Sequence, residues 1–253
     1  MRLALWSAAL MAIATARADQ AVVLKTVSTG PMQYYLSLPN GWSAQKKWPV
    51  VVVIESANRQ FQNAAEVFAK ARGERPFILV TPLVTTNGGA NYRQASGYHY
   101  DDKAWSEIER VGRCRFDMEG IAAVVADVQR NYGGESKYFI SGFEAGGHTL
   151  WTVLFRQPQA LRAVAAVSTN YAGRCMEDGG FQQGPADLPV RLFAGANEMA
   201  GGARSPLVGQ TQRAKETAEQ HGFRNFSEQV VPGKGHEPLA DEVLEYFYSV
   251  WRQ

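Results

Sequence analysis

The sequence has a low net charge, only two cysteines and few long apolar runs. The 253 residues carry a formal charge of +2, and no Lys/Arg-rich run breaks the mixed pattern, so we do not expect a nucleic-acid-binding protein. After the first residues, no stretch is long and apolar enough to span a bilayer, and we expect no membrane partner. No linker, repeat or low-complexity tract indicates a division into several domains.

The first 18 residues have the pattern of a secretory signal peptide. Met1-Arg2 gives a basic start, residues 3–14 are apolar, and Ala16-Arg17-Ala18 resembles a cleavage site. A membrane anchor is the alternative, but the run is shorter than the ~20 residues needed to cross a bilayer. We therefore expect cleavage after Ala18, a single domain over residues 19–253, and a mature protein that is secreted or periplasmic.

The two cysteines, Cys114 and Cys175, each follow the dipeptide Gly-Arg. Export makes a disulfide chemically possible, and both residues fall in predicted loops at the same end of the sheet. We expect them to be bonded, the alternative being two buried thiols. A cysteine nucleophile would need a histidine partner in space, and neither spacing suggests one.

Apolar patterning predicts alternating strands and helices. Strands are expected over residues 32–39, 48–56, 76–82, 137–141, 162–169, 189–195 and 226–233. Helices are expected over residues 62–73, 116–133 (with Asp117 as its cap), 210–222 and 238–253, with another that ends near Phe155. Residues 83–115 form a long polar and aromatic segment. This alternation predicts an α/β protein with a mostly parallel sheet, helices on both faces, and ligands bound at the carboxyl ends of the strands.

The sequence Gly142-Phe143-Glu144-Ala145-Gly146-Gly147 directly follows one of these strands. It has the spacing of the G-x-S-x-G elbow, in which small residues let one side chain stand exposed at a sharp strand-to-helix turn. Glu144 occupies the apex, where the motif has serine. The glycines alone would also fit an ordinary tight turn.

An acid and a histidine follow in order. Glu198 lies just after the strand at 189–195, and His236 lies in the loop before the last helix. Apex, acid, histidine is the chain order of α/β-hydrolases. Asn197 and Glu237 are alternative partners for His236.

Residues from about 34 to 252 resemble the α/β-hydrolase fold, closest to its secreted poly(3-hydroxybutyrate) depolymerase-like and feruloyl esterase-like branch. The resemblance lies in the strand at 48–56, the elbow, the sequence Gly195-Ala196-Asn197-Glu198 and the sequence Gly233-Lys234-Gly235-His236. It implies a serine esterase with a Ser-His-Asp triad that acts on polyester or plant-wall esters. The chain departs from it at the apex, at the acid, and at Glu55-Ser56, where the family has His-Gly.

A glutamate at the apex has no proton to lose at neutral pH, but it can attack carbon directly, and it suits an sp³ carbon better than an ester carbonyl. Its carboxylate could also fold into the oxyanion hole, for which we expect the amides of Ala145 and of Ser56 or Ala57.

Three functions remain open. In the first, a hydrolase, Glu144 is nucleophile or general base, His236 activates water, and Glu198 orients His236. The second is a non-catalytic protein that binds its ligand in the cleft, for which the aromatic segment 92–105 could stack on sugars or aromatics. The third is a metal site formed by Glu144, His148 and His236. We favour the hydrolase, with a small-molecule or polymer-ester ligand and with neither metal nor cofactor.

Overall fold

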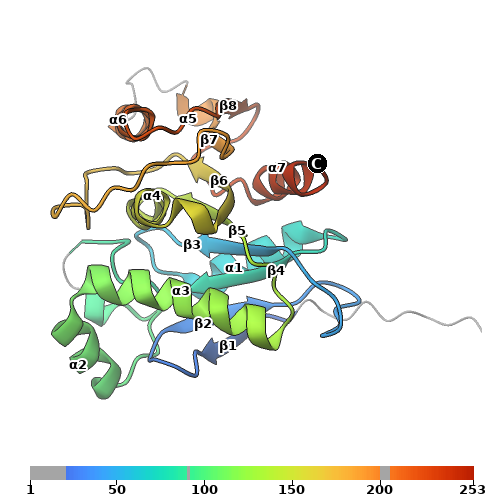
Figure 1. Ribbon diagram of the computed structural model, residues 1–253, viewed down its shortest axis with the longest axis vertical. Helices are drawn as coiled ribbons and strands as arrows, with labels where there is room; N and C mark the ends of the chain where they lie inside the picture. Colours follow the sequence, from blue (N-terminus) through green and yellow to red (C-terminus); the bar gives the residue numbers. More distant parts are fainter. Residues whose placement is uncertain (1–20, 90–91, 200–205) are drawn as a thin grey trace, which may run out of the picture.

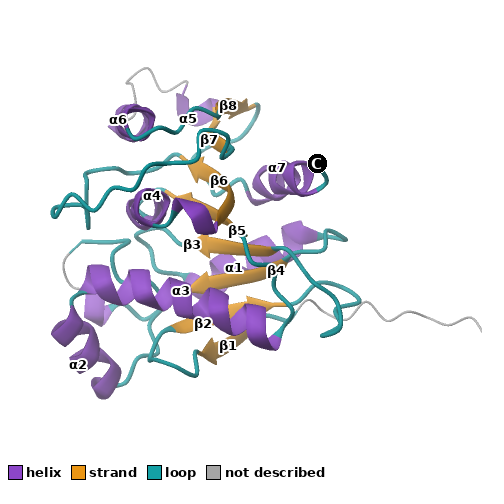
Figure 2. Ribbon diagram, in the orientation of Figure 1, coloured by secondary structure: helices purple, strands orange, loops and turns teal. Residues whose placement is uncertain are grey.

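A computed structural model describes residues 21–89, 92–199 and 206–253 of the protein. The expected signal peptide and its cleavage site lie outside these residues. One sheet runs through the centre of the molecule, with helices against both of its faces (Figures 1 and 2). No helix in the described ranges has the length and apolar character needed to cross a membrane.

The sheet has eight strands in the order β1-β2-β4-β3-β5-β6-β7-β8. The first three in this order pair antiparallel, and all other neighbours pair parallel. The strands are β1 (Val23–Thr26), β2 (Gln33–Ser37), β3 (Val50–Ile54), β4 (Ile78–Pro82), β5 (Tyr138–Phe143), β6 (Leu161–Val167), β7 (Val190–Gly195) and β8 (Phe226–Val231).

The helices are α1 (Phe61–Arg72), α2 (Asp102–Val111), α3 (Arg113–Asn131), α4 (Gly146–Arg156), α5 (Ala196–Met199), α6 (Pro206–Gln220) and α7 (Ala240–Trp251). Two short 3₁₀ turns, η1 (Tyr92–Gln94) and η2 (Pro158–Ala160), complete the assigned elements. Helices α1 and α7 lie against one face of the sheet, and α3, α4 and α6 lie against the other (Figure 1).

Strand β3 shows why its sequence is a continuous apolar run. Val50, Val52 and Ile54 face one core cluster, while Val51 and Val53 face the other, and all five are buried. Successive side chains of a strand point to opposite faces, so a strand covered on both faces needs apolar residues throughout. The predicted mostly parallel sheet is confirmed.

Three local predictions need correction. Strand β1 was not expected, because its four residues lie at the edge of the sheet and are only partly buried. The segment 83–115 contains helix α2, whose Ala104, Trp105 and Ile108 face the core. Asp117 does not cap a helix, because α3 begins at Arg113; its buried carboxylate instead accepts hydrogen bonds from Thr85 and Thr86.

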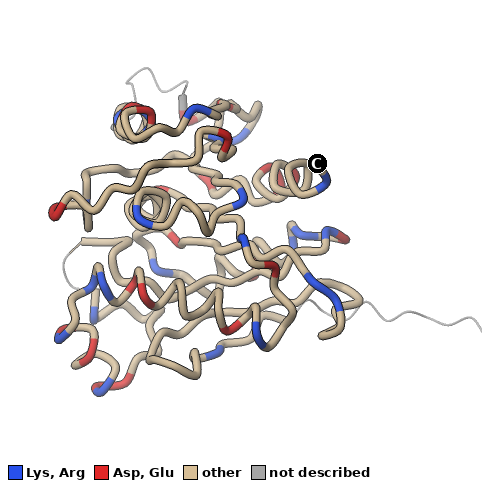
Figure 3. The backbone as a smooth tube through the Cα atoms, viewed as in Figure 1, with Lys and Arg blue, Asp and Glu red and all other residues tan. Residues whose placement is uncertain are grey.

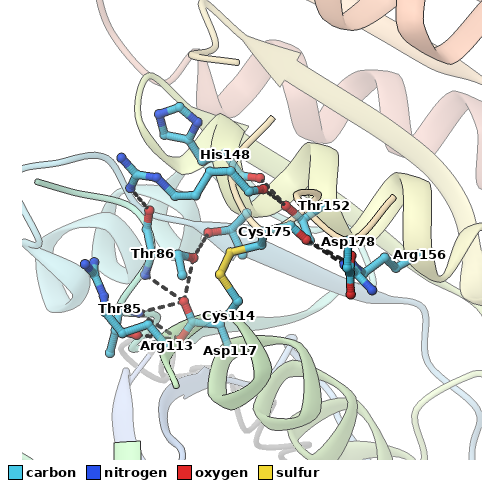
Figure 4. Close-up of a disulfide and its surroundings, with 12 residues drawn as sticks. Thr85, Thr86, Arg113, Cys114, Asp117, His148, Thr152, Arg156, Cys175 and Asp178 are labelled. Atoms are coloured by element: carbon cyan, nitrogen blue, oxygen red, sulfur yellow. Dashed lines mark hydrogen bonds and ion pairs between the residues drawn. A yellow bond between two sulfur atoms is a disulfide. The ribbon is translucent and has the colours of Figure 1, made fainter. Parts of the chain in front are cut away.

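The structure joins Cys114 and Cys175 in a disulfide, as the sequence predicts. The bond ties the start of α3 to the loop after β6 (Figure 4). Elsewhere, basic and acidic side chains are interspersed along the described chain (Figure 3).

Candidate active site

Parallel pairing brings five strand ends to one edge of the sheet. Ile54 pairs with Gly142, Val167 pairs with Phe143 and Phe193, and Gly195 pairs with Val231. The residues that follow β3, β5, β6, β7 and β8 therefore emerge together. The expected site residues from four separate stretches of sequence lie at this edge.

The turn after β5 holds Glu144 in a left-handed conformation, with φ of 48°. Such a φ is uncommon for a residue other than glycine, and it is the geometry that exposes the apex of an elbow. Glu144 N donates to Val167 O over 3.1 Å, and Glu144 O accepts from the amides of Gly147 and Asn170, each over 2.9 Å. Backbone hydrogen bonds thus fix the turn on both sides.

Two glycines let this turn approach its neighbours. A methyl group added to Gly146 would lie 2.5 Å from the backbone oxygen of Ile54, and one added to Gly142 would lie 2.9 Å from Cβ of Leu150. Both distances are too short for a real contact. Helix α4 can begin against β3 only because these positions lack a side chain.

The Glu144 carboxylate turns back toward the loop after β3. Its Oε2 accepts a hydrogen bond from the amide of Ala57 over 3.0 Å. The sequence predicts Ser56 or Ala57 as this donor. The amide that donates is that of Ala57, and the Ser56 hydroxyl instead donates to Glu55 over 3.0 Å. The Ala145 amide, the other expected donor, makes no hydrogen bond within the described part of the chain. Of the two expected donors, one therefore binds the protein's own carboxylate, and the other has no hydrogen-bond partner among the described residues.

His236 is paired with Glu198. Its Nδ1 lies 3.0 Å from Glu198 Oε1, and the other carboxylate oxygen accepts from the Ser168 hydroxyl over 2.6 Å. The Glu198 side chain is 9% exposed and that of His236 is 43% exposed, so the pair has a buried and an open end. The His236 ring also packs on Phe143, which precedes the apex, with ring centres 4.7 Å apart.

The two alternative partners of His236 make other contacts. Asn197 binds the backbone oxygens of Lys234 and Gly233, which holds the histidine loop against the end of β7. Glu237 forms an ion pair with Lys234 over 3.0 Å. The geometry therefore selects Glu198. Ser168, which extends the chain of hydrogen bonds, was missed because a serine after a strand carries no distinctive sequence pattern.

Glu55 places a second carboxyl group near the apex. Burial raises the pKa of Glu55, and the nearby charge of Glu144 raises it further, while hydrogen bonds from Ser56 and Gln60 lower it. Asn87 donates to the backbone oxygens of Glu55 and Ser56, which fixes the loop that carries the Ala57 amide. In the sequence, Glu55 stood out because Glu55-Ser56 replaces the His-Gly of the family it resembles.

His148 lies one turn along α4 from the apex. Burial lowers the pKa of His148 to about 4, the charge of Arg174 lowers it further, and the charge of Glu144 opposes this. The ring is therefore neutral near pH 7, and its buried Nδ1 has no hydrogen-bond partner. Among the described residues no group of three or more His, Cys, Asp or Glu side chains is arranged to hold a metal, so Glu144, His148 and His236 do not converge on one.

The aromatic segment before α3 packs against itself. Tyr98 and Tyr100 stack with ring centres 5.8 Å apart, and Trp105 meets both edge-on. The Tyr98 hydroxyl donates to Val84 O and the Tyr100 hydroxyl to Leu83 O. These rings hold the segment onto the core, so they are not a free stacking platform for a ligand.

A scan against models of known protein families finds no match, and a search of curated proteins finds no similar sequence. Solved structures do resemble the chain. S-formylglutathione hydrolase from Agrobacterium tumefaciens superposes with a TM-score of 0.62 at 14% identity, over 91% of this chain and 94% of that one. Poly(aspartic acid) hydrolase-1 from Sphingomonas sp. KT-1 gives 0.59 at 15% identity, over 91% and 98%.

Two esterases extend this likeness. Esterase PE8 gives a TM-score of 0.58 at 19% identity, over 90% of this chain and 99% of that one. A thermostable esterase gives 0.54 at 13% identity, and the match spans 93% of this chain but only 63% of the esterase. Identities this low establish the fold alone. The chain has the α/β-hydrolase fold.

Proposed function

We propose that the protein is an exported hydrolase that acts through the carboxylate of Glu144, with His236 activating water and Glu198 orienting His236. The observation that carries this proposal is the hydrogen bond from the Ala57 amide to Glu144 Oε2. It holds one carboxylate oxygen, while Oε1 has no hydrogen bond within the described residues. A carboxylate fixed through one oxygen can present the other to a substrate.

In the first step Oε1 attacks an sp³ carbon that carries a leaving group. A bond forms between Oε1 and this carbon, and the leaving group departs with the bonding electrons. The product is an ester on Glu144. A carboxylate suits this reaction, whereas attack on an ester carbonyl would give a high-energy anhydride.

In the second step water hydrolyses this ester. His236 takes a proton from water, the hydroxide attacks Cδ of Glu144, and negative charge develops on Oε2, which already accepts from Ala57. Collapse of the intermediate breaks the bond between Cδ and Oε1, and the product alcohol leaves with Oε1 and the proton from His236. Glu198 orients the imidazole and stabilises its charged form.

The motif order supports a place near the poly(3-hydroxybutyrate) depolymerase-like and feruloyl esterase-like branch. The exchange of serine for glutamate favours a different substrate from the carbonyl esters that this resemblance implies. We propose a small molecule, or a fragment of a polymer, with an electrophilic sp³ carbon beside Glu144.

Oxygen labelling tests the mechanism. The mature protein is reacted with small epoxides and haloalkanes, and a single turnover of any substrate is run in H₂¹⁸O. Nucleophilic catalysis puts ¹⁸O into the Glu144 peptide and leaves the first product unlabelled. Label in the first product would instead make Glu144 a general base.

Two variants separate the sites. Glu144→Gln removes the attacking carboxylate and should abolish turnover, whereas Glu55→Gln alters the neighbouring carboxyl and should retain the labelling pattern. If the unmodified protein transforms none of these compounds, the nucleophile assignment is overturned.

A non-catalytic binding protein is the second candidate, and the same hydrogen bond favours it. With Oε2 on the Ala57 amide, the carboxylate occupies the place of the oxyanion and blocks acyl transfer. Calorimetry that detects a ligand which the protein binds but does not transform would favour this function.

Export is supported by the disulfide, since such bonds persist in oxidising compartments. Fractionation of cells that express the full chain should place the protein outside the cytoplasm, with Asp19 as its first residue. An intact Met1 on the cytoplasmic protein would contradict export.

A further inference from the structure

Three arginines from separate stretches of the chain, Arg59 and Arg174 in loops and Arg113 at the start of α3, meet at the backbone of Gly88. Arg174 Nη1 donates to Gly88 O over 2.9 Å, and Arg113 Nη2 approaches the same oxygen at 3.4 Å. A methyl group added to Gly88 would lie 2.0 Å from Nη2 of Arg59, so that guanidinium rests directly on the glycine. Three cations therefore share one short stretch of backbone.

The disulfide holds two of these arginines in place. Arg113 and Arg174 each precede one of the bonded cysteines, whose Cα atoms are 5.4 Å apart. Figure 4 shows Arg113 on the side of the disulfide where Thr86 lies, with Arg156 on the opposite side. The repeated Gly-Arg-Cys pattern thus has a structural consequence, which is to bring two guanidinium groups together.

Few acidic charges oppose this group in the described part of the chain. Burial and the charges of Arg113 and Arg59 lower the pKa of Arg174, and the charge of Glu177 only partly opposes them. Within the described ranges, Arg59, Arg113 and Arg174 form no ion pair. The buried carboxylate of Asp117 accepts hydrogen bonds from the amides and hydroxyls of Thr85 and Thr86 and makes no ion pair with these arginines. Like charges held together without an ion-pair contact disfavour the empty state, so the arrangement points to a missing anion.

The guanidinium groups also keep unused donors. Among the described residues, Arg113 and Arg174 each donate through only one guanidinium nitrogen. The Nε atoms of Arg59 and Arg113 are buried without a hydrogen-bond partner, so the terminal Nη atoms are the donors that can reach a ligand. Arg113 is further fixed over the ring of Tyr92, at 3.9 Å from the ring centre. The arginines are thus positioned by backbone and ring contacts, with donors left for a ligand.

We propose that Arg59, Arg113 and Arg174 form a subsite for the oxyacid group, phosphate or carboxylate, of an acidic small molecule. The planar guanidinium fork matches both groups and binds them through paired hydrogen bonds. The subsite is distinct from the reaction proposed at Glu144, because binding at the arginines requires no turnover.

Its place in the fold connects it with the apex. Arg59 lies two residues after Ala57, whose amide holds Glu144. The hydroxyl of Thr152 donates to the backbone oxygens of both His148 and Arg174, which ties the first turn of α4 to the loop that carries the arginine. A ligand anchored by its acid group at the arginines would therefore direct its remaining part toward Glu144, and a neutral analogue would lose this anchor.

Equilibrium binding to the mature protein tests the subsite. Inorganic phosphate, succinate and sodium chloride are titrated at matched ionic strength and followed by calorimetry and thermal unfolding. Phosphate or succinate should bind and raise the melting temperature where chloride does not, and the stronger of the two identifies the acid group. Each of Arg59→Gln, Arg113→Gln and Arg174→Gln should weaken binding ~10–100-fold, the effect of losing a charged hydrogen-bonding partner.

Three further variants make the outcome decisive. Arg110→Gln removes an exposed arginine that pairs with Glu107, and should leave binding unchanged. Arg174→Lys keeps the charge without the fork and should recover only part of the affinity. Glu144→Gln should still bind, even if it abolishes turnover, so this test is independent of the reaction. Absence of binding by folded unmodified protein, or equal binding by the arginine variants, would overturn the proposal.

Discussion

The carboxylate of Glu144 and the amide of Ala57 are joined by a 3.0 Å hydrogen bond. In a serine hydrolase, an amide in this position binds the oxyanion that forms during acyl transfer. Here the side chain of Glu144 accepts from the amide in its place. The Ala57 amide therefore has a hydrogen-bond partner without any ligand. A substitution at Glu144 changes the reacting group and also frees the Ala57 amide.

Replacing Glu144 with serine should create esterase activity. The variant empties the donor at Ala57 and places a hydroxyl at the apex of the elbow. We expect the rate of aryl-ester hydrolysis to rise roughly 10-fold or more over the unmodified protein. Loss of one oxyanion donor lowers the rate of a serine hydrolase by ~10²–10³, which is only part of its total rate enhancement, so even a distorted oxyanion hole should leave a measurable gain. Ester hydrolysis and labelling by a fluorophosphonate probe measure the gain.

Glu144→Ala is the control, since it empties the donor without adding a nucleophile. A folded Glu144→Ser protein that shows no gain would mean that the histidine and the oxyanion donors are not arranged for acyl transfer. Strong labelling of the unmodified protein would reveal another nucleophilic serine.

The activity of the Glu144→Ser variant should depend on Glu198. Adding Glu198→Gln keeps the shape of the side chain but removes the charge that orients His236, and should lower the rate ~10²-fold or more. Glu237→Gln is the matched control, because Glu237 pairs with Lys234 instead. Equal losses in the two double variants would contradict the His236–Glu198 assignment.

Removing the disulfide should destabilise the fold by ~4 kcal/mol. The bond closes a loop with a sequence separation of 61, and the chain-entropy model relates loop length to this amount. Urea unfolding of the protein in which serine replaces both Cys114 and Cys175 measures the difference. A thiol titration of the denatured, unreduced protein should find no free thiol, and two free thiols would refute the pairing.

Mild acid should destabilise the fold through His148. Its folded pKa of about 4 lies below the unfolded value of ~6.5, so the folded state prefers the neutral ring. The resulting stability is present above pH 6.5 and is lost as the pH falls through 6.5 toward 4. Since the ring is only partly buried, we expect the unmodified protein to lose about 1 kcal/mol more than His148→Gln between pH 7 and 5. Urea unfolding at pH 7 and at pH 5 measures both losses. An equal loss of unfolding free energy in the two proteins would contradict this prediction.

Gly146→Ala should lower stability by roughly 1–3 kcal/mol, because the added methyl group would collide with the backbone of β3. Gly30→Ala serves as the comparison, since its methyl group would find only an ordinary contact at 3.9 Å. Chemical denaturation measures both. A Gly146→Ala protein as stable as Gly30→Ala would show that the elbow can shift without cost.

The sequence predicts the central elements because their burial leaves a local pattern. The valines of β3 are apolar without interruption, since both faces of the strand are covered. Helix α2 was missed because its apolar residues, Trp105 and Ile108, lie in a segment dominated by aromatic and polar residues. Asp117 resembled a helix cap, but its partners Thr85 and Thr86 are more than 30 residues away in sequence, where no local pattern indicates them.

The residues of the candidate site also differ in how well the sequence predicts them. Elbow spacing and chain order point to Glu144, Glu198 and His236 as candidates. The donor Ala57 could be located only to within one residue, because amide direction depends on the loop conformation. Ser168 follows β6 and reaches Glu198 because β6 pairs with β7. The sequence does not show which strands are neighbours, so it could not predict this contact.

The backbone of the elbow makes the chemistry of this protein easy to change in evolution. Three main-chain hydrogen bonds, to Val167, Gly147 and Asn170, hold the left-handed turn at Glu144, and none of them involves its side chain. The apex residue can therefore be exchanged while the architecture around it is preserved. A change within a single codon separates a carboxylate from a hydroxyl at this position, which makes the scaffold a natural starting point for directed evolution of new reactions.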